Sequence, residues 1–233
     1  MDIEALAASG RPWPYPVPSA DGRVVGPEGL ILPMPPQAHP YLARMARFVD
    51  GAEHAARRDE VLAALPALAG LEETAFRLAG SLTGERVDVV PIAQDVPIVV
   101  LGEAMGVGDV SVEIGALCDT GTVSDSLPAI AITSLLFQCR DATAALITNA
   151  LADGIPVELA TAVVLTRRAG AVWVLLRSAP FGAGAHACPG REHALALARG
   201  VVRAFAEYDV NERGPNDRRA NIRMPSRLVM RQR

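Results

Sequence analysis

One cysteine stands in a chemically suggestive place, within a small-residue stretch directly before a predicted helix. Segment 181–190 reads FGAGAHACPG and precedes an apolar-periodic run. A backbone rich in glycine and alanine can lie very close to a flat ligand. Pro189 suits a first helical position, which predicts Cys188 as the helix N-cap. Free N–H groups and the helix dipole favour a thiolate there, and thiolates are iron ligands.

A histidine and an arginine form a second candidate pair. His54 and Arg58 lie four residues apart in a predicted helix that Asp50 can cap. Their spacing places both on one helix face, one turn apart. Two cationic or hydrogen-bonding groups stacked in this way suit a pair of carboxylates. A solvated helix face would give the same pattern.

The third candidate region is the middle of a long apolar segment. The sequence predicts a helix over 129–152, with its polar residues gathered between Gln138 and Thr143. Polar side chains in a core helix are costly unless they are satisfied or serve a site. Gln138, Arg140 and Asp141 are therefore candidate catalytic residues.

The segment 181–190 resembles the cysteine-ligand loop of cytochromes P450, Phe-x-x-Gly-x-His/Arg-x-Cys-x-Gly. The matching positions are Phe181, Gly184, His186, Cys188 and Gly190. The resemblance implies that Cys188 is the axial thiolate of a haem b iron and that Phe181 shields the sulfur. It also implies that His186 reaches a haem propionate and that N–H groups after Cys188, at Gly190, temper the charge on sulfur.

Two further motifs extend this resemblance along the chain. Segment 50–58 is similar to Asp-x-x-x-His-x-x-x-Arg of the family, which implies that His54 and Arg58 bind a propionate. The family also has a strand with Arg-x-Ala, and Arg167 before Arg168-Ala169 fits it. Arg167 would then bind the second propionate, with Arg168 as the alternative. A surface location is the other interpretation of both arginines.

Several departures from the family pattern concern oxygen chemistry. The family's Ala-Gly-x-Asp/Glu-Thr-Thr falls on residues 138–143, where Asp141 keeps the acid but Ala142 replaces the first threonine. Gln138 and Cys139 replace the small pair. No glutamate is followed three residues later by arginine, so the family's Glu-x-x-Arg pair is absent. Only residues 110–128 stand where the family has two helices and a lid.

The predicted fold is mainly α with small β elements, a truncated cytochrome P450-like fold in one domain over 1–233. Residues 1–40 are proline-dense and predict an extended N-terminal arm with short extended segments at 23–25 and 30–32. A hairpin is expected within 161–177. A helix is expected over 192–208, followed by a loop at 211–216.

Composition restricts the classes of partner. The formal net charge is −4, which argues against nucleic acid. Three cysteines without paired spacing agree with a reducing compartment. We found no signal-peptide pattern and no apolar run expected to span a membrane, so a cytoplasmic location is expected. A missing lid would expose apolar surface, which predicts a homodimer.

The resemblance implies a haem-thiolate enzyme that oxidises a small organic molecule, a secondary metabolite, with atypical oxygen activation. A ferredoxin-type electron donor could meet a basic face formed by Arg57, Arg177 and Arg191. Two alternatives stay open at this point. One is a haem-thiolate enzyme for an isomerisation, dehydration, cyclisation or peroxide-driven step. The other is a non-catalytic haem-binding sensor or accessory protein.

Overall fold

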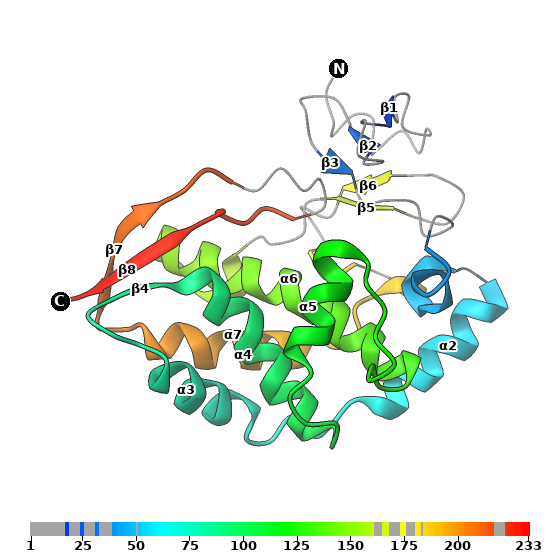
Figure 1. The fold of residues 1–233 in the computed structure, drawn as a ribbon. Helices are drawn as coiled ribbons and strands as arrows, with labels where there is room; N and C mark the ends of the chain where they lie inside the picture. The colour runs from blue at the N-terminus through cyan, green and yellow to red at the C-terminus, as the bar shows by residue number, and fades with distance from the viewer. Residues whose placement is uncertain are drawn as a thin grey trace.

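The structure is a computed structural model of the 233-residue chain. It describes residues 17–18, 24–25, 31–32, 39–49, 51–160, 165–167, 173–175, 180–182, 184–216 and 222–233. The predicted mainly α architecture is confirmed (Figure 1). The α-helices of the described residues are α2 (Gly51–Ala64), α3 (Leu71–Ser81), α4 (Val89–Ala104), α5 (Ser111–Thr120), α6 (Ile130–Asp153) and α7 (Arg191–Ala204).

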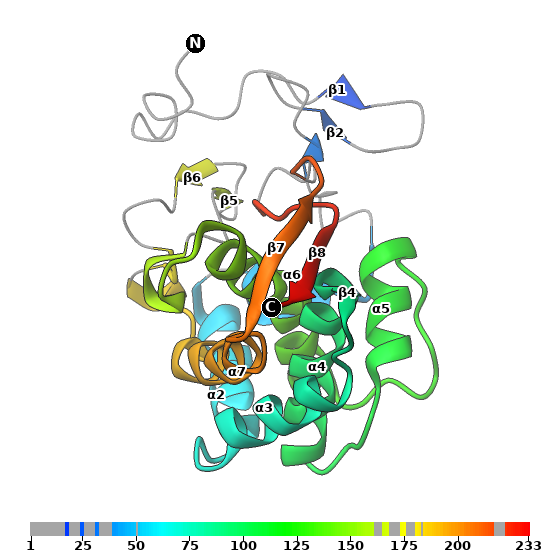
Figure 2. The same ribbon diagram turned by 90° about the vertical axis from the view of Figure 1, so that its left-hand side faces the viewer.

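Helix α6 is the centre of the helical body. It packs against α2, α4, α5 and α7, and Figures 1 and 2 show it enclosed by other elements. Its Leu136 and Ile147 side chains are fully buried. By length and composition alone α6 could cross a membrane, contrary to the expectation from sequence. However, 56% of its most apolar window is buried inside the protein, which is the pattern of a core helix.

Helices α3 and α7 approach each other closely at a glycine. A Cβ added to Gly200 would lie 2.3 Å from the Glu72 carbonyl oxygen and 2.9 Å from the Ala75 Cβ. Any larger residue would push the helices apart. The predicted apolar stripe of α7 faces the core, with Leu195, Ala198 and Phe205 buried. This packing fixes the start of α7, and with it the cysteine loop.

A three-stranded antiparallel sheet of order β4-β8-β7 borders the helices (Figure 2). Its strands are β4 (Arg86–Asp88), β7 (Tyr208–Arg213) and β8 (Leu228–Gln232). The predicted loop at 211–216 and the predicted helix end at 208 were therefore wrong. β7 is largely polar and exposed, so its sequence lacks strand periodicity. β7 is a strand because its main chain pairs with β8, whose first three residues are buried.

The remaining strands are short. The expected hairpin is confirmed as β5 (Leu165–Arg167) antiparallel to β6 (Trp173–Leu175). The two extended segments of the N-terminal arm are confirmed as β2 (Val24–Val25) and β3 (Ile31–Leu32), which form a sheet with β1 (Val17–Pro18). The rest of the arm before residue 39 lies outside the described residues.

The region between α4 and α6, where sequence comparison predicted a largely missing lid, contains one ten-residue helix. α5 buries Ile114 and Leu117 and packs against α6. It ends at Gly121, whose φ of 72° is in the left-handed region. The Gly121 carbonyl oxygen lies 2.7 Å from His39 Nε2, which ties the end of α5 to the segment preceding α2.

Short 3-10 helices complete the description. They are η3 (Leu42–Arg44), η4 (Ala46–Phe48), η5 (Val157–Leu159) and η6 (Gly184–His186). Two of them lie next to the candidate site: η4 contributes Ala46 and Arg47 to the cavity described below, and η6 ends two residues before Cys188.

Candidate functional site

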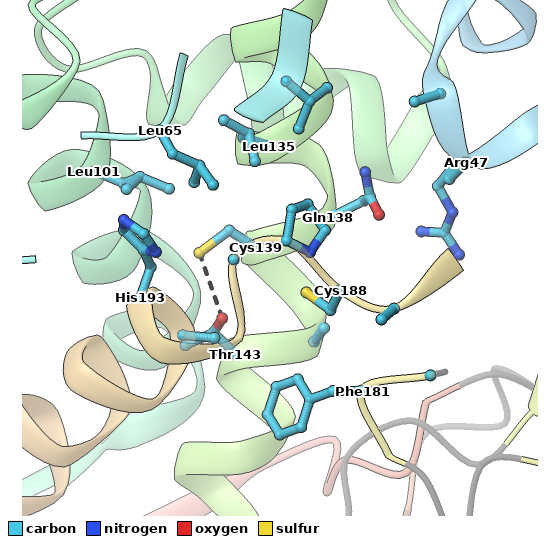
Figure 3. Close-up of a pocket in the computed structure, with 18 of the residues that line it drawn as sticks. Arg47, Leu65, Leu101, Leu135, Gln138, Cys139, Thr143, Phe181, Cys188 and His193 are labelled. Carbon is cyan, nitrogen blue, oxygen red and sulfur yellow. Dashed lines mark hydrogen bonds between the residues drawn. The ribbon is translucent and has the colours of Figure 1, made fainter. Parts of the chain in front are cut away.

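A cavity opens between α2, α6 and the segment that leads into α7 (Figure 3). The centres of water molecules can reach about 220 Å³ of it, many times the space that one water needs. Its walls combine apolar side chains such as Val61, Leu135 and Leu197 with a few polar ones. Ligand sites have this composition.

The cysteine loop is closed by its own backbone. The Cys188 N–H donates to the Phe181 carbonyl oxygen at 2.7 Å, and the Ala187 N–H donates to the Gly184 carbonyl oxygen at 3.1 Å. Gly182 and Gly184 have φ values of 73° and 61°, a conformation that glycine adopts without strain. This turn presents the Cys188 side chain to the cavity.

The predicted helix boundary at Cys188 was wrong by two residues. α7 begins at Arg191 with Gly190 as N-cap, because Pro189 and Gly190 form a turn instead of the first helical positions. The expected preference for the thiolate was also wrong for the protein alone. Burial raises the pKa of the Cys188 thiol, and the Gly190 N–H and the charges of Arg47 and Arg58 oppose that rise. The effect of burial is larger than the combined effect of these three groups, which favour the thiolate.

His54 and Arg58 do share one face of α2, and both line the cavity. His54 is buried, with 5% of its surface exposed. Arg58 Nη1 donates to the Ala187 carbonyl oxygen at 2.7 Å. This hydrogen bond joins α2 to the cysteine loop beside Cys188, so the two motifs recognised separately in the sequence are in direct contact.

The α6 wall presents Leu135, Gln138, Cys139, Ala142, Thr143 and Leu146. Gln138 Nε2 donates to the Ser134 carbonyl oxygen at 3.0 Å and to its Oγ at 3.1 Å. Cys139 Sγ lies 3.4 Å from Thr143 Oγ1, the dashed line in Figure 3. Burial raises the pKa of the Cys139 thiol to about 11, so this wall is uncharged near neutral pH.

Arg140 and Asp141 are absent from the cavity wall. Arg140 Nη1 and Nη2 each donate to an Asp119 carboxylate oxygen at 2.9 Å, and Nη1 lies 3.2 Å from Asp141 Oδ1. Gln94 Nε2 also donates to Asp141 Oδ1, at 3.1 Å. Burial lowers the pKa of Arg140, but the Asp119 hydrogen bonds and the Asp141 charge outweigh it and raise that pKa. Of the three candidate catalytic residues, Gln138 alone reaches the cavity.

Helical geometry explains this division. At 100° per residue, the six cavity-facing residues of α6 centre on one direction, and positions 140 and 141 each lie about 130° from it. Arg140 and Asp141 therefore face α5 and α4, where Asp119 and Gln94 meet them. Periodicity alone separates Arg140 from Gln138, which are about 160° apart, but Asp141 is only about 60° from Gln138, and the contacts with Gln94 and Arg140 show that it faces away from the cavity. Periodicity does not say which face meets the cavity.

Among the apolar and polar lining residues that the sequence did not indicate, two carry ionisable side chains. Arg47 lines the cavity from η4, and His193 lines it from the first turn of α7. His193 Nε2 lies 2.9 Å from the Pro66 carbonyl oxygen. Its Nδ1 is buried and has no hydrogen-bond partner among the described residues. His193 follows Cys188 by five positions, which was an available signal, whereas nothing in the sequence distinguished Arg47.

The other predicted cofactor residues are placed as follows. Phe181 lines the cavity beside Cys188, and the Arg191 guanidinium carbon lies 5.4 Å from its ring centre. Gly190 also lines the cavity. The His186 and Arg167 side chains and all of Arg168 lie outside the described residues. Their predicted contacts with propionates stay predictions.

Comparison with known proteins supports the fold. No family model matches the chain, and no curated protein matches its sequence. Several solved structures, by contrast, are similar to the chain in fold. A versatile cytochrome P450 enzyme from Bacillus subtilis is 14% identical, with a TM-score of 0.64 over 83% of this chain and 88% of that one. A thermophilic cytochrome P450 from Sulfolobus tokodaii is 16% identical, with a TM-score of 0.61 over 81% and 82%.

A third similar structure comes from work on unusual cytochrome P450-like monooxygenases involved in microbial secondary metabolism. It is 15% identical, with a TM-score of 0.60 over 81% of this chain and 82% of that one. The chain therefore has a cytochrome P450-like fold, as its cysteine loop suggested. At these identities the likeness concerns the fold, and the chemistry must be argued from the cavity.

The described cavity residues fit a haem. Cys188 supplies a sulfur ligand of the kind that binds haem iron. His54 and Arg58 stand on one side, where cationic or hydrogen-bonding groups would meet carboxylates. Leu65, which follows α2, and leucines from α4, α6 and α7, with Phe181, supply the apolar walls that a macrocycle requires. Haem iron bound there would supply a positive charge that favours the Cys188 thiolate.

Proposed function

We propose that this chain is a haem-thiolate protein of the cytochrome P450 type, with haem b, that oxidises a small organic molecule. One observation supports this most directly: Cys188 faces a cavity also lined by His54 and Arg58. The three residues come from segments 130 positions apart, and the Arg58 to Ala187 hydrogen bond joins those segments.

Bound haem with a thiolate ligand supplies oxidising chemistry, and the protein positions it. Cys188 would hold the iron, and the Gly190 N–H would moderate the charge on sulfur. His54 and Arg58 would neutralise one propionate. Arg167, or Arg168, together with His186 would meet the other. Because Arg58 also bonds the cysteine loop, propionate binding and placement of Cys188 are coupled in this proposal.

Proton handling would be atypical. Ala142 has no hydroxyl, but Thr143 lies one position later on the cavity wall and keeps one within 3.4 Å of Cys139 Sγ. Gln138 adds an amide oxygen. Asp141 and Arg140 would act behind this wall, as a charged layer between α4, α5 and α6, and would reach substrate only through intervening groups. Asp141→Asn should then slow turnover without changing haem content.

A second candidate function is a haem-thiolate enzyme for a step without oxygen insertion, such as isomerisation, dehydration, cyclisation or a peroxide-driven reaction. The α6 wall favours it, because Gln138 and Cys139 are larger than the alanine and glycine of the family motif. Turnover that needs no external electron donor would support this candidate over the first.

The substrate and partners are part of the proposal. A small secondary metabolite agrees with the secondary-metabolism role stated for one similar structure. A ferredoxin-type donor would meet the predicted basic face. Of its residues, Arg191 lies over Phe181 of the cysteine loop, Arg57 donates to the Ala43 carbonyl oxygen, and Arg177 lies outside the described residues. A cytoplasmic homodimer completes the proposal. Sedimentation at micromolar concentration tests the dimer.

The decisive experiment is the absorption spectrum of the purified, haem-reconstituted protein after reduction and exposure to carbon monoxide. We expect the strongly red-shifted Soret band of thiolate-ligated haem. Cys188→Ala should abolish that band, whereas Cys118→Ala, on α5 and away from the cavity wall, should keep it. Failure of the parent protein to bind haem, or an unchanged band in Cys188→Ala, would refute the proposal.

A further inference from the structure

Arg47 places a positive charge on the cavity wall from outside the family motifs. It belongs to η4, ahead of α2, and lines the cavity with its neighbour Ala46. Figure 3 shows Arg47 at the end of the cavity opposite His193 and Leu101, with Gln138 on the near part of the α6 wall. The Arg47 guanidinium carbon lies 5.1 Å from the Phe48 ring centre, a contact that leaves its N–H groups for a ligand.

The charge of Arg47 is not matched by a carboxylate. Within the described part of the chain, no aspartate or glutamate forms an ion pair with Arg47, although many other arginines form one. Burial lowers the pKa of its guanidinium, and the sulfurs of Cys188 and Cys118 are the groups that oppose this. Arg47 is half-buried, and a charge removed in part from water without a partner is costly. If Cys188 binds iron, the iron neutralises the negative charge on its sulfur, and that charge no longer offsets the positive charge of Arg47.

Haem carboxylates would already have partners. A haem has two propionates, and the proposed function assigns His54 and Arg58 to one and Arg167 or Arg168 with His186 to the other. Arg47 is an additional cation. Figure 3 shows Arg47 near Gln138 of the α6 wall. The charges of Arg47 and Arg58 both act on Cys188, but within the described residues only Arg58 of the two forms a hydrogen bond with the cysteine loop. This favours a carboxylate of the substrate over a carboxylate of the cofactor.

The surroundings of Arg47 also define the rest of such a ligand. Ala46, Val61 and Leu135 form an apolar cluster, and all three line the cavity. The neighbouring Gln138 has its amide nitrogen bonded to Ser134, which leaves its oxygen as the acceptor. The ligand that fits has an anionic end for Arg47 and a short apolar body for this cluster.

We propose that Arg47 is the anchor for the carboxylate of a small organic acid substrate, whose apolar body lies against Ala46, Val61 and Leu135. This inference rests on the proposed function, because it names the substrate class for the same site. Gln138 would accept a hydrogen bond from a hydroxyl or amide of the substrate. Neutral analogues of the same shape should bind more weakly.

Calorimetric titration of the haem-loaded protein tests this with hexanoate and hexanamide as probes. Hexanoate should bind about tenfold more tightly than hexanamide, because charge-assisted hydrogen bonds are roughly twice as strong as neutral ones. Arg47→Gln should abolish that preference, and Arg47→Lys should keep part of it. Arg44→Gln is the matched control. Arg44 is exposed three positions away, over the Tyr41 ring, and does not line the cavity.

Haem content, measured in parallel for every variant, separates this inference from the proposed function. Unchanged haem content with loss of the hexanoate preference in Arg47→Gln supports the substrate anchor. Loss of haem in Arg47→Gln but not in Arg44→Gln would overturn it in favour of a propionate partner. An unaltered preference in Arg47→Gln, or no hexanoate binding by the parent, would also overturn it. Failure of the parent to bind haem would contradict the proposed function. The same calorimetric titration of the haem-free protein would then test the carboxylate preference of Arg47 separately, and no preference there would overturn this inference as well.

Discussion

Helix α6 carries polar groups on two faces, and their surroundings differ. On the face toward α4 and α5, Arg140 donates hydrogen bonds to Asp119, and Asp141 accepts one from Gln94. On the cavity face, Gln138 and Thr143 bond only to residues of α6 itself in the described structure. On this helix the charged groups therefore stabilise the packing, while the uncharged polar groups of the other face are available to a ligand.

The largest expected effect is on the charged face. Arg140→Met should lower the free energy of unfolding by about 3 kcal/mol, because it leaves two carboxylates without their buried cation. Urea unfolding measures this. Arg199→Met is the control, since the Arg199–Glu158 pair is exposed and such pairs contribute about 1 kcal/mol or less. Equal losses in both variants would mean that the Arg140 network is not structural.

The Cys139 thiol, on the cavity face, should react slowly with alkylating reagents. With a pKa of about 11, its thiol is almost wholly protonated at pH 8, and alkylation by iodoacetamide should be about a hundredfold slower than for an ordinary cysteine. The rate should rise about tenfold per pH unit until the pKa is reached. Peptide mass spectrometry measures it, with Cys139→Ser identifying the peptide. Rapid alkylation at pH 7 would contradict an apolar setting for this sulfur.

Gln138 tests whether the cavity wall restricts access. Gln138→Ala should increase the affinity of the haem-loaded protein for imidazole about tenfold, because removing the long side chain would widen the cavity at the α6 wall that Gln138 lines. The free energy of unfolding should change by less than about 1 kcal/mol, since the lost hydrogen bonds are local to α6. Spectral titration measures the affinity. Gln94→Ala, on the charged face, should leave it unchanged.

The smallest expected effect concerns Asp95, near the charged face. Burial raises the pKa of its carboxyl, Arg140 opposes the rise, and Asp109 and Asp119 add to it. An acid whose folded pKa is raised contributes stability at low pH, and this is lost as pH rises through that pKa. Asp95→Asn should therefore be slightly more stable than the parent at pH 7. This gain in stability should disappear below the ordinary aspartate pKa of about 4. A variant that is more stable than the parent at pH 3 but not at pH 7 would contradict this interpretation. Thermal unfolding at both pH values measures it.

The local motifs of the cavity could be recognised from sequence. Cys188 with its glycine-rich loop depends on neighbours within ten residues. His54 and Arg58 need only a helix to share a face. The long helix that became α6 was expected at 129–152 and spans Ile130–Asp153, because its apolar composition extends over many turns. The β5–β6 hairpin is likewise set by a short, local pattern.

Features that depend on distant partners were not predictable. β7 is polar and becomes a strand because β8 offers it a hydrogen-bonding edge. The thiol of Cys188 was expected to ionise at a helix start, but the turn at Pro189 and Gly190 moves that start to Arg191. Arg47 faces the cavity only because of how η4 lies beside α6.

The sequence by itself determined the kind of site, because the residue types and spacings around Cys188, His54 and Arg58 are local properties of the chain. The tertiary structure decided which polar residues serve that site. It turned Arg140 and Asp141 toward α5 and α4 and left Gln138, Thr143 and Arg47 at the cavity. The rotation of a helix about its axis is set by the whole of its packing, which no short segment encodes.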